Sequence, residues 1–373
     1  MTNVTGMRAL FWCSTILVVY VYVGYPLLLR LWARLRPRPF RLQTSNFRLQ
    51  PRVSIVIAAR NEGARLAARM DNLLSLDYPA GKRQIVVVSD GSTDDTLEVL
   101  ARYAGCVDVV AIPTGGKAVA LNAGVARATG DVLVFTDARQ MFEANALREL
   151  VAPLANPSIG AVTGELLLDA ESPGLAAQST IAEGVGLYWK YEKQIRRSES
   201  AIDSTLGATG AIYAMRRSLF RPLPPDTLLD DVLAPMRVVL AGYRVVFNER
   251  ARAFDRAAVD ADAEARRKVR TIAGNYQILA LEPRLLLPIR NRVWLQYVSH
   301  KIGRLVVPYA MLAMFVASIA LAAAHPFYLA VLAGYVALML LAACGAVIEY
   351  RSQIADGRLE APRPVAPPVG RIA

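Results

Sequence analysis

The stretch QIVVVSDGSTDDT, residues 84–96, is the strongest indication of the fold. Its apolar first half is typical of a strand buried on both faces, as in a parallel sheet. Gly91 then permits a tight turn, and the hydroxyl and carboxyl side chains after it suit the positive N-terminus of a helix. Capping explains those side chains without a ligand, but it does not explain Asp90 at the strand tip. A carboxylate there can accept a hydrogen bond from a base N–H or a ribose hydroxyl.

The same order of strand, turn and helix recurs along the central part of the chain. Further strands, likewise apolar and expected to be buried on both faces, are predicted at residues 52–58, 107–112 and 131–136, and helices at 62–76, 94–103 and 117–128. This alternation predicts an α/β layer fold whose ligands bind at the carboxyl ends of the strands. Residues that directly follow a strand are therefore the candidate site residues.

Two other strand-to-helix junctions carry candidate ligand-binding groups. After the first strand, AARNEG places Glu62 at the turn. After the third, TGGKAVALNAG combines Gly115 and Gly116, which permit close approach of the backbone, with Lys117 at a helix start that favours an anion. The spacing is not that of a Walker A loop. Lys117 is also open to interpretation as a solvated lysine at a helix start.

The fourth strand ends in FTDARQ, residues 135–140. A strand-end Asp-x-Asp is a familiar way to hold a divalent cation, but here Asp137 is followed by Arg139 in place of a second Asp. Both a metal site with one carboxylate and a phosphate site that uses Arg139 are open.

The second half of the central part adds LGATGAIYAMRR at 206–217 and TLLDDVLAPMRVVLAGYRVVF at 227–247. In the latter stretch, Asp230 and Asp231 are expected to precede a helix that Gly242 ends. The two carboxylates are either helix caps or a catalytic group. One positioned Asp is sufficient to act as a general base toward an attacking hydroxyl.

The rest of the chain predicts membrane segments. Of the 373 residues 54% are hydrophobic, and uncharged runs of 21, 20 and 22 residues lie at 9–29, 305–324 and 327–348. Each run is long enough to cross a hydrocarbon core of ~30 Å as a helix. The first is expected to be a retained anchor, because its apolar region is too long for a signal peptide. Arginines cluster directly after it, which predicts an N-terminus outside and a cytoplasmic central region.

Charge and scarce residue types exclude several function classes. The formal net charge is +12, but much of the excess flanks the apolar runs, so anionic lipid is a simpler partner than nucleic acid. Three scattered cysteines provide neither a disulfide framework nor a zinc pattern. The only histidines, His300 and His325, nearly exclude a histidine metal centre or a Ser-His-Asp triad in the central region.

Five stretches, VSIVIAARNEG, VVVSDGSTDDT, GGKAVALNAGVARATGDVLVFTDA, GATGAIYAMRR and LLDDVLAPMRVVLAGYRV, together resemble the membrane-bound family 2 glycosyltransferases of bacterial polysaccharide synthesis. These are related to cellulose, hyaluronan and chito-oligosaccharide synthases. The resemblance implies a GT-A fold with a mixed, mainly parallel sheet and about three transmembrane helices. It also implies a nucleotide-diphosphate sugar donor, with UDP-sugar favoured, and inverting transfer to a lipid-linked or growing polysaccharide acceptor.

The resemblance also implies roles for individual residues. The expected donor-binding residues are Glu62, Asp90, Lys117 and Asp137, and Arg139 is a further candidate that departs from the family pattern. The loop beneath the acceptor and donor sugar is expected from Gly207, Thr209 and Gly210. Asp231 matches the catalytic base of the family, and Asp230 stands beside it where Glu is usual.

Two departures from the family pattern leave alternatives open. In one view Asp137, diphosphate oxygens and water hold Mg²⁺ or Mn²⁺, weakened because Arg139 replaces the second Asp. In the other, Arg139 pairs with the diphosphate and replaces part of the cation's charge. The basic stretch EARRKVRTIAGNYQ, residues 264–277, stands in place of the Gln-x-x-Arg-Trp motif. Either this stretch contacts the diphosphate through Arg270, or it forms a solvated basic face against the membrane.

These expectations divide the chain into an N-terminal anchor (1–31), a basic linker (32–50), a glycosyltransferase domain (51–283), an interfacial amphipathic helix (284–304), a two-helix transmembrane hairpin (305–348) and a Pro-rich tail (349–373). The expected location is the bacterial inner membrane, with other synthesis or export subunits as further partners. Two other functions are open. They are a sugar-nucleotide transferase or pyrophosphorylase, and a catalytically idle scaffold subunit that binds nucleotide-sugar.

Overall fold

The computed structural model describes residues 2–39, 50–169, 180–256 and 261–355. The chain forms two compact units, one from Val21 to Leu305 and the other from the parts before and after it. Most of the predicted Pro-rich tail, and residues 40–49 of the predicted linker, lie outside the described residues.

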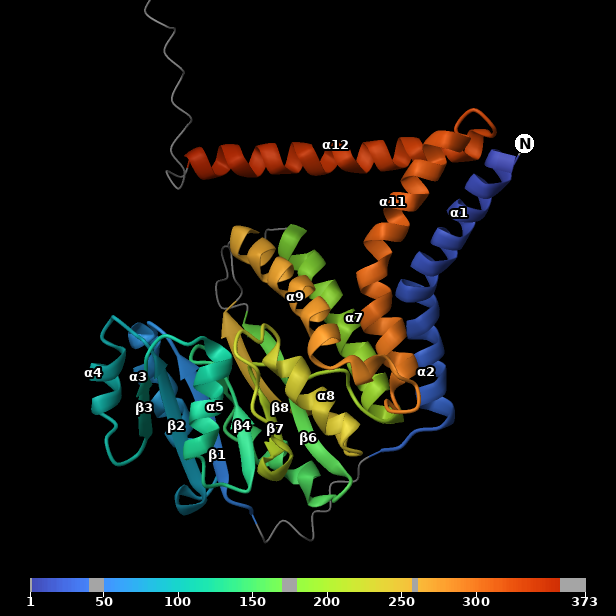
Figure 1. Ribbon diagram of the computed structural model, residues 1–373. Helices are drawn as coiled ribbons and strands as arrows, with labels where there is room; N and C mark the ends of the chain where they lie inside the picture. The colour runs from blue at the N-terminus through green and yellow to red at the C-terminus, as the bar shows by residue number, and fades with distance from the viewer. Residues whose placement is uncertain (1, 40–49, 170–179, 257–260, 356–373) are drawn as a thin grey trace, which may run out of the picture. The chain divides into compact units, whose positions relative to one another are not determined.

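The larger unit is built on an eight-stranded sheet with the strand order β3-β2-β1-β4-β7-β6-β8-β5 (Figure 1). The strands are β1 Val53–Ala59, β2 Arg83–Asp90, β3 Asp108–Ile112, β4 Val132–Phe135, β5 Met141–Phe142, β6 Ile159–Asp169, β7 Tyr213–Arg216 and β8 Arg244–Arg256. β1 pairs in parallel with β2 and β4, and β2 with β3. β7 runs antiparallel to β4 and β6, β6 is parallel to β8, and β5 is antiparallel to β8. The sheet is therefore mixed, and the carboxyl ends of β1, β2 and β4 lie together at one end of the strands.

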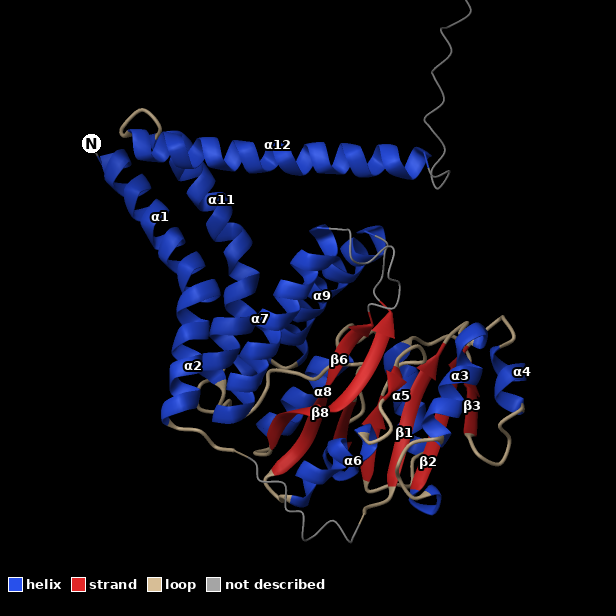
Figure 2. Cartoon of the chain, turned by 180° about the vertical axis from the view of Figure 1, so that it is seen from behind, coloured by secondary structure: helices blue, strands red, loops and turns tan. Residues whose placement is uncertain are grey.

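Helices cover both faces of this sheet (Figures 1 and 2). The helices packed on it are α3 Gly63–Leu74, α4 Thr96–Ala101, α5 Lys117–Arg127, α6 Ala146–Val151 and α8 Asp230–Leu240. The unit also contains α2 Tyr25–Leu35, α7 Thr180–Ile202, α9 Ala261–Leu281 and the short α10 Trp294–Gln296. Side chains of β1 alternate between two apolar layers, because successive residues of a strand point to opposite faces. Ile55 and Ile57 pack with α3 and α6, whereas Val56 packs with α5 and α8.

The strands and helices predicted between residues 52 and 136 are all present, with bounds within two residues of the prediction. One detail of that prediction is wrong. β3 is not buried on both faces, since Val109 is exposed and its neighbours are half-buried. It lies at the edge of the sheet, where β2 is its partner. Asp230 and Asp231 also form the first turn of α8 and do not precede it.

The interfacial helix predicted over 284–304 is not one helix. Pro283–Leu286 forms a 3₁₀ turn, and helical structure resumes only at Trp294, continuing through the π-helical turn Tyr297–Ile302. Pro288 lies in the break, and proline lacks the N–H that a continuous helix would use. The segment Trp294–Leu321 is instead long and apolar enough to cross a membrane.

Three helical segments of the described chain have the length and composition of membrane spans, as predicted: Val4–Leu35, Trp294–Leu321 and Pro326–Ile348. In the smaller unit, α1 (Thr2–Val19), α11 (Gly303–Leu321) and α12 (Pro326–Ala355) share an apolar cluster around Phe11. Tyr335 of α12 still contacts α11 through Phe315, but Leu338 and Leu341 are 67% and 69% exposed. The predicted hairpin is therefore packed only near its turn. Exposed apolar surface of this extent suits a lipid environment.

Candidate active site

Charged side chains from α5, from α8 and from the residues after β4 meet where the parallel strands end. Lys117 begins α5 and places Nζ 3.0 Å from Asp137 Oδ1 and 3.3 Å from Asp230 Oδ1. Burial lowers the pKa of Lys117, but the negative charges of Asp230, Asp137 and Asp231 outweigh it and raise this pKa above its usual range. Lys117 is therefore a charged, ion-paired group and not a solvated lysine at a helix start. Together, Lys117, Asp137, Asp230 and Asp231 are called the Lys117 cluster below.

Asp231 is held at the start of α8 by a glycine-containing loop. The backbone N–H of Gly210 donates to Asp231 Oδ2 at 3.1 Å, and that of Ala208 donates to the Asp231 carbonyl at 2.7 Å. Burial and the neighbouring Asp230 carboxylate raise the pKa of Asp231 to about 6, although Lys117 opposes them. A carboxylate with such a pKa is mostly ionised at neutral pH and still basic enough to accept a proton.

The predicted loop at 207–210 touches Asp231 at two glycines. A Cβ on Gly210 would lie 2.9 Å from Asp231 Oδ2, and Gly207 has a positive φ of 139°. Thr209 between them is buried, where its Oγ1 accepts a hydrogen bond of 2.6 Å from Arg196. The Thr209 side chain thus supports the loop from within the protein, while Gly207 and Gly210 allow close approach to α8.

Two buried oxygens have no hydrogen-bond partner among the described residues: Asp230 Oδ2 within the Lys117 cluster and the Tyr213 hydroxyl near it. Asp230 is 2% exposed and Tyr213 is 1% exposed. Burial, followed by the charges of Asp230 and Asp231, raises the pKa of Tyr213, so its hydroxyl stays protonated. Unpartnered buried oxygens are costly, and two of those in the described residues lie at this site.

Asp90 and Glu62 also lie where the parallel strands end, and each already has hydrogen-bond partners within the protein. Asp90 Oδ1 and Oδ2 accept the backbone N–H groups of Gly115 and Gly116, at 2.6 and 3.0 Å. This carboxylate therefore fixes the glycine loop that precedes Lys117. Glu62, directly before α3, accepts a hydrogen bond at Oε2 from Arg65 Nη1 in the first turn of that helix, at 3.0 Å. These contacts give both residues a local structural role besides any contact with a nucleotide.

Arg139 is paired away from the Lys117 cluster. Its Nη2 lies 3.1 Å from Asp255 Oδ2 on β8, and Gln140 Nε2 donates to the same oxygen at 2.9 Å. Asp255 is 9% exposed, so the pair is partly shielded from water. The Arg139 side chain is 49% exposed and has this one carboxylate partner among the described residues, so its pairing with a diphosphate stays a prediction.

A buried arginine below Asp137 was not predicted. Arg69 of α3 is fully buried, donates from Nη2 to Thr136 Oγ1 at 2.8 Å and from Nη1 to Asn72 Oδ1 at 2.7 Å. Burial lowers the pKa of Arg69 to about 9, and the charge of Asp137 opposes this. The sequence signal was its spacing, since Leu66, Arg69 and Leu73 fall on one helical face. A basic residue on an otherwise apolar face indicates a buried partner.

The basic stretch at 264–277 lies in α9, as its helical spacing predicted. Arg270 donates from Nη2 to the carbonyl oxygen of Leu228 at 3.0 Å, close before the acidic pair in the sequence. In this position Arg270 holds the protein backbone, a role that neither of the two alternatives for it had included.

Comparison with known proteins identifies residues 54–223 of the larger unit. Residues 54–223 match the family model described as glycosyl transferase family 2. The chain carries a family 2 glycosyltransferase domain. The matched part of the domain contains Lys117, Asp137 and the loop at 207–210, and it ends before α8.

The relatives of this family 2 domain include polysaccharide synthases. The chain is 25% identical over 206 residues to a poly-β-1,6-N-acetyl-D-glucosamine synthase of Staphylococcus epidermidis, covering 53% of this chain and 48% of that protein. It is 29% identical over 213 residues to the probable glycosyltransferase YdaM of Bacillus subtilis, covering 54% and 50%. The chain thus spans about half the length of these relatives.

Among solved structures, a mannosyltransferase of Pyrobaculum calidifontis, in complex with GDP-Man and Mn²⁺, superposes with a TM-score of 0.69. The likeness covers 90% of this chain and 92% of that one at 23% identity. It shows a shared fold, so the predicted GT-A type with a mixed sheet is confirmed.

The predicted metal ligand of the family 2 domain is the carboxylate of Asp137, which closely follows β4 and belongs to the Lys117 cluster. Within the described residues, no three His, Cys, Asp or Glu side chains are grouped to hold a metal. The Asp137 side chain is 37% exposed beside Lys117. Mg²⁺ commonly binds one or two carboxylates together with substrate phosphates. These residues therefore fit a cation that binds with a diphosphate, and they do not fit an all-protein metal centre.

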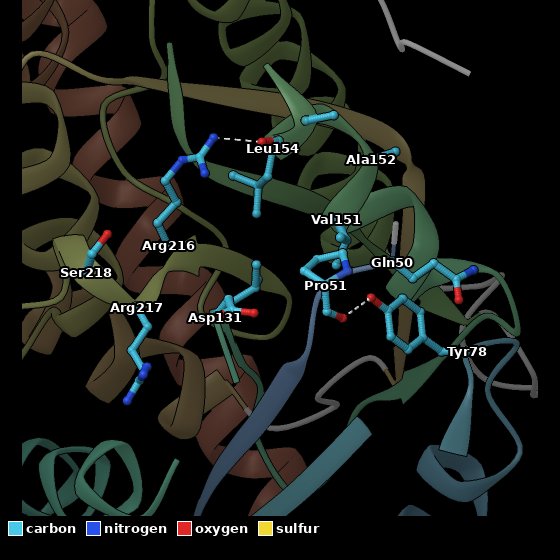
Figure 3. Close-up of a pocket in the computed structure, with 12 residues that line it drawn as sticks. Gln50, Pro51, Tyr78, Asp131, Val151, Ala152, Leu154, Arg216, Arg217 and Ser218 are labelled. Atoms are coloured by element: carbon cyan, nitrogen blue, oxygen red, sulfur yellow. Dashed lines mark hydrogen bonds between the residues drawn. The ribbon is translucent and has the colours of Figure 1, made fainter. Parts of the chain in front are cut away.

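A cavity of about 620 Å³ in the family 2 domain lies away from the Lys117 cluster. Its lining includes Pro51 and Asp131, which precede β1 and β4, and Arg216 at the end of the antiparallel β7 (Figure 3). The cavity therefore lies at the N-terminal ends of the parallel strands, whereas the Lys117 cluster lies at their carboxyl ends. Arg216 points toward Leu154 and donates to its carbonyl at 2.7 Å, so this guanidinium supports the wall.

Proposed function

We propose that the chain is an inverting glycosyltransferase that moves a hexosyl or N-acetylhexosaminyl group from a nucleotide-diphosphate sugar to a lipid-linked or growing polysaccharide acceptor. UDP-sugars are the favoured donors. The observation that carries this proposal is the Lys117 cluster, which puts a cation and a carboxylate of raised pKa at one end of a family 2 domain. The relative named as a poly-β-1,6-N-acetyl-D-glucosamine synthase supports a polysaccharide product.

The proposed reaction is a single displacement at the anomeric carbon. The acceptor hydroxyl oxygen forms the new bond to that carbon while its proton passes to Asp231. The bond from the anomeric carbon to the diphosphate oxygen breaks, and its electron pair leaves with the nucleoside diphosphate. Lys117 stabilises the negative charge that develops on the leaving group, because a fixed cation stabilises such charge most strongly where water is excluded.

Asp137 and the donor phosphates would hold Mg²⁺ or Mn²⁺ on the leaving-group side. Such an ion supplies additional positive charge beside the departing diphosphate. The mannosyltransferase with the same fold was solved with both GDP-Man and Mn²⁺, which supports a cation here.

We further propose that the chain lies in the bacterial inner membrane, with its N-terminus outside and the family 2 domain in the cytoplasm. The three candidate spans and the arginines after the first of them support this orientation. On α9, Val269 and Ile272 are exposed beside several basic residues. Apolar and basic side chains together suit a surface of anionic lipid. Other synthesis or export subunits are proposed partners.

The decisive experiment offers membranes containing the full chain a panel of radiolabelled UDP-glucose, UDP-N-acetylglucosamine and GDP-mannose. Transfer of label to lipid or polymer, abolished by Asp231→Asn, is the expected result. Release or exchange of pyrophosphate would favour the transferase or pyrophosphorylase alternative. Binding of these donors without turnover would favour the scaffold alternative.

A further inference from the structure

One face of α9 holds the short segment that leads into the acidic pair. Gln277 Oε1 accepts the backbone N–H of Leu228 at 2.9 Å, and Gln277 Nε2 donates to the carbonyl of Asp226 at 2.9 Å. The carbonyl of Leu228 accepts from Arg270 at 3.0 Å. Side chains of α9 therefore hold both backbone polar groups of Leu228, and Gln277 uses both ends of its amide.

The helix also packs closely against this segment. Gly274 lies between Arg270 and Gln277 at helical spacing, so the three residues share a face. A Cβ on Gly274 would lie 2.4 Å from Leu229 Cγ and 3.2 Å from Leu228 Cβ. A glycine is thus required for α9 to come near enough for the hydrogen bonds of Gln277.

The held segment has a backbone that it would not adopt readily without support. Asp226 has a φ of 62°, the left-handed region that is unfavourable for residues other than glycine. Its carbonyl is the acceptor for Gln277 Nε2. Two residues after Leu228 the chain enters α8, where the Leu229 carbonyl accepts the N–H of Leu233 at 3.0 Å. The contacts of Gln277 therefore hold the backbone directly before α8.

We propose that Gln277 is a positioning residue for Asp230 and Asp231. The proposal rests on the proposed function, in which Asp231 is the base. Gln277 holds the backbone from which the Asp230 carboxylate reaches Lys117 and the Asp231 carboxylate reaches Gly210. A displacement of about 1 Å in such a group can reduce turnover roughly 100-fold.

The test compares the full chain in lipid nanodiscs with Gln277→Ala, Gln277→Glu and the control Asn275→Ala. Asn275 lies on the same helix, and its Nδ2 donates to the Thr271 carbonyl at 2.8 Å, within α9 itself. Two quantities are measured. One is hydrogen exchange in peptides that contain residues 226–233, and the other is kcat and KM for the most active donor of the panel.

For Gln277→Ala we expect faster exchange in residues 226–233 and unchanged exchange in β1 and β4. We also expect kcat to fall roughly 10- to 100-fold with a donor KM within about twofold of wild type. Gln277→Glu retains the acceptor for Leu228 but has no N–H for Asp226, so its kcat should lie between those of Gln277→Ala and wild type. Asn275→Ala should match wild type in both measurements.

Three results would overturn the proposal. The first is faster exchange at 226–233 with kcat unchanged, and the second is no change in exchange there. The third is faster exchange throughout the sheet, which would assign Gln277 a general role in folding. If wild type transfers sugar from none of the donors in the panel, the proposed function is overturned. The proposed role of Gln277 in positioning the base then fails with it.

Discussion

Sugar transfer should lose activity as the pH falls through the pKa of Asp231. Burial and the Asp230 charge raise this pKa from 3.8 to about 6. A general base acts only when deprotonated, and the deprotonated fraction at this pKa is about nine-tenths at pH 7 and about one-tenth at pH 5. Because kcat/KM reports the free enzyme, it should fall roughly tenfold between pH 7 and pH 5.

Two variants separate the contributions to this profile. Asp231→Asn removes the base, so activity should fall roughly 10²- to 10⁴-fold and the residual rate should lack the acidic limb. Asp230→Asn removes a negative charge that raises the pKa of Asp231. Its acidic limb should therefore move to lower pH, whatever the effect on the maximal rate.

The assay measures release of nucleoside diphosphate by the full chain in nanodiscs, with donor well below KM so that rates report kcat/KM. Circular dichroism at each pH checks that the protein stays folded. Equal wild-type activity at pH 5 and pH 7, or an acidic limb that persists unchanged in Asp231→Asn, would refute the assignment of Asp231 as the base.

Three substitutions and one treatment test other parts of the site. Lys117→Met should weaken binding of UDP-N-acetylglucosamine at least about tenfold by calorimetry, because a hydrogen bond to a charged group contributes about 1.5–3 kcal/mol; unchanged affinity would contradict this. Gly210→Ala should lower kcat, since the new Cβ would lie 2.9 Å from Asp231 Oδ2, whereas the control Gly81→Ala meets no described atom within 4 Å. Arg69→Ala should destabilise the domain by at least about 1.5–3 kcal/mol through its lost hydrogen bonds, seen as a lower Tm; a Tm equal to wild type would argue against that role. Excess EDTA should abolish transfer and Mn²⁺ should restore it, and full activity in EDTA would exclude the cation.

Local patterns were sufficient to predict the parallel half of the sheet. The runs that became β1, β2 and β4 are apolar and end in turn residues, so their positions follow from the sequence nearby. Parallel pairing then brings their ends to one edge. This explains why Lys117 and Asp137 could be expected near each other, and their ion pair of 3.0 Å agrees with that expectation.

Partners distant in sequence were not predictable in the same way. Asp255 is far from Arg139 along the chain and gave no local signal that it would take the guanidinium. The amide of Gln277 likewise bonds to the backbone about 50 residues before it. Backbone acceptors and donors are present at every residue, so sequence patterns do not indicate which of them a side chain will use.

The interfacial segment shows a different limit. Leucines, Trp294 and basic residues alternate over 284–304 as they would in an amphipathic helix. The interruption comes from Pro288, whose effect depends on whether neighbouring structure holds the chain on either side. Asn291 provides such support, since its Nδ2 donates to the Leu285 carbonyl at 2.8 Å across the break.

The ion pairs around Lys117 also have a consequence for the electrical balance of the site. Three carboxylates, of Asp137, Asp230 and Asp231, act on the Lys117 ammonium group, so these four ionised side chains have an excess of negative charge. Further positive charge acts on Asp231 from Lys301 and on Asp137 from Arg69. A nucleoside diphosphate is itself an anion and would add to that excess. It therefore needs countercharge, brought by a divalent ion or by protons taken up by the carboxylates. Affinities for nucleotide, cation and proton are then thermodynamically linked, and each ligand strengthens or weakens the others reciprocally.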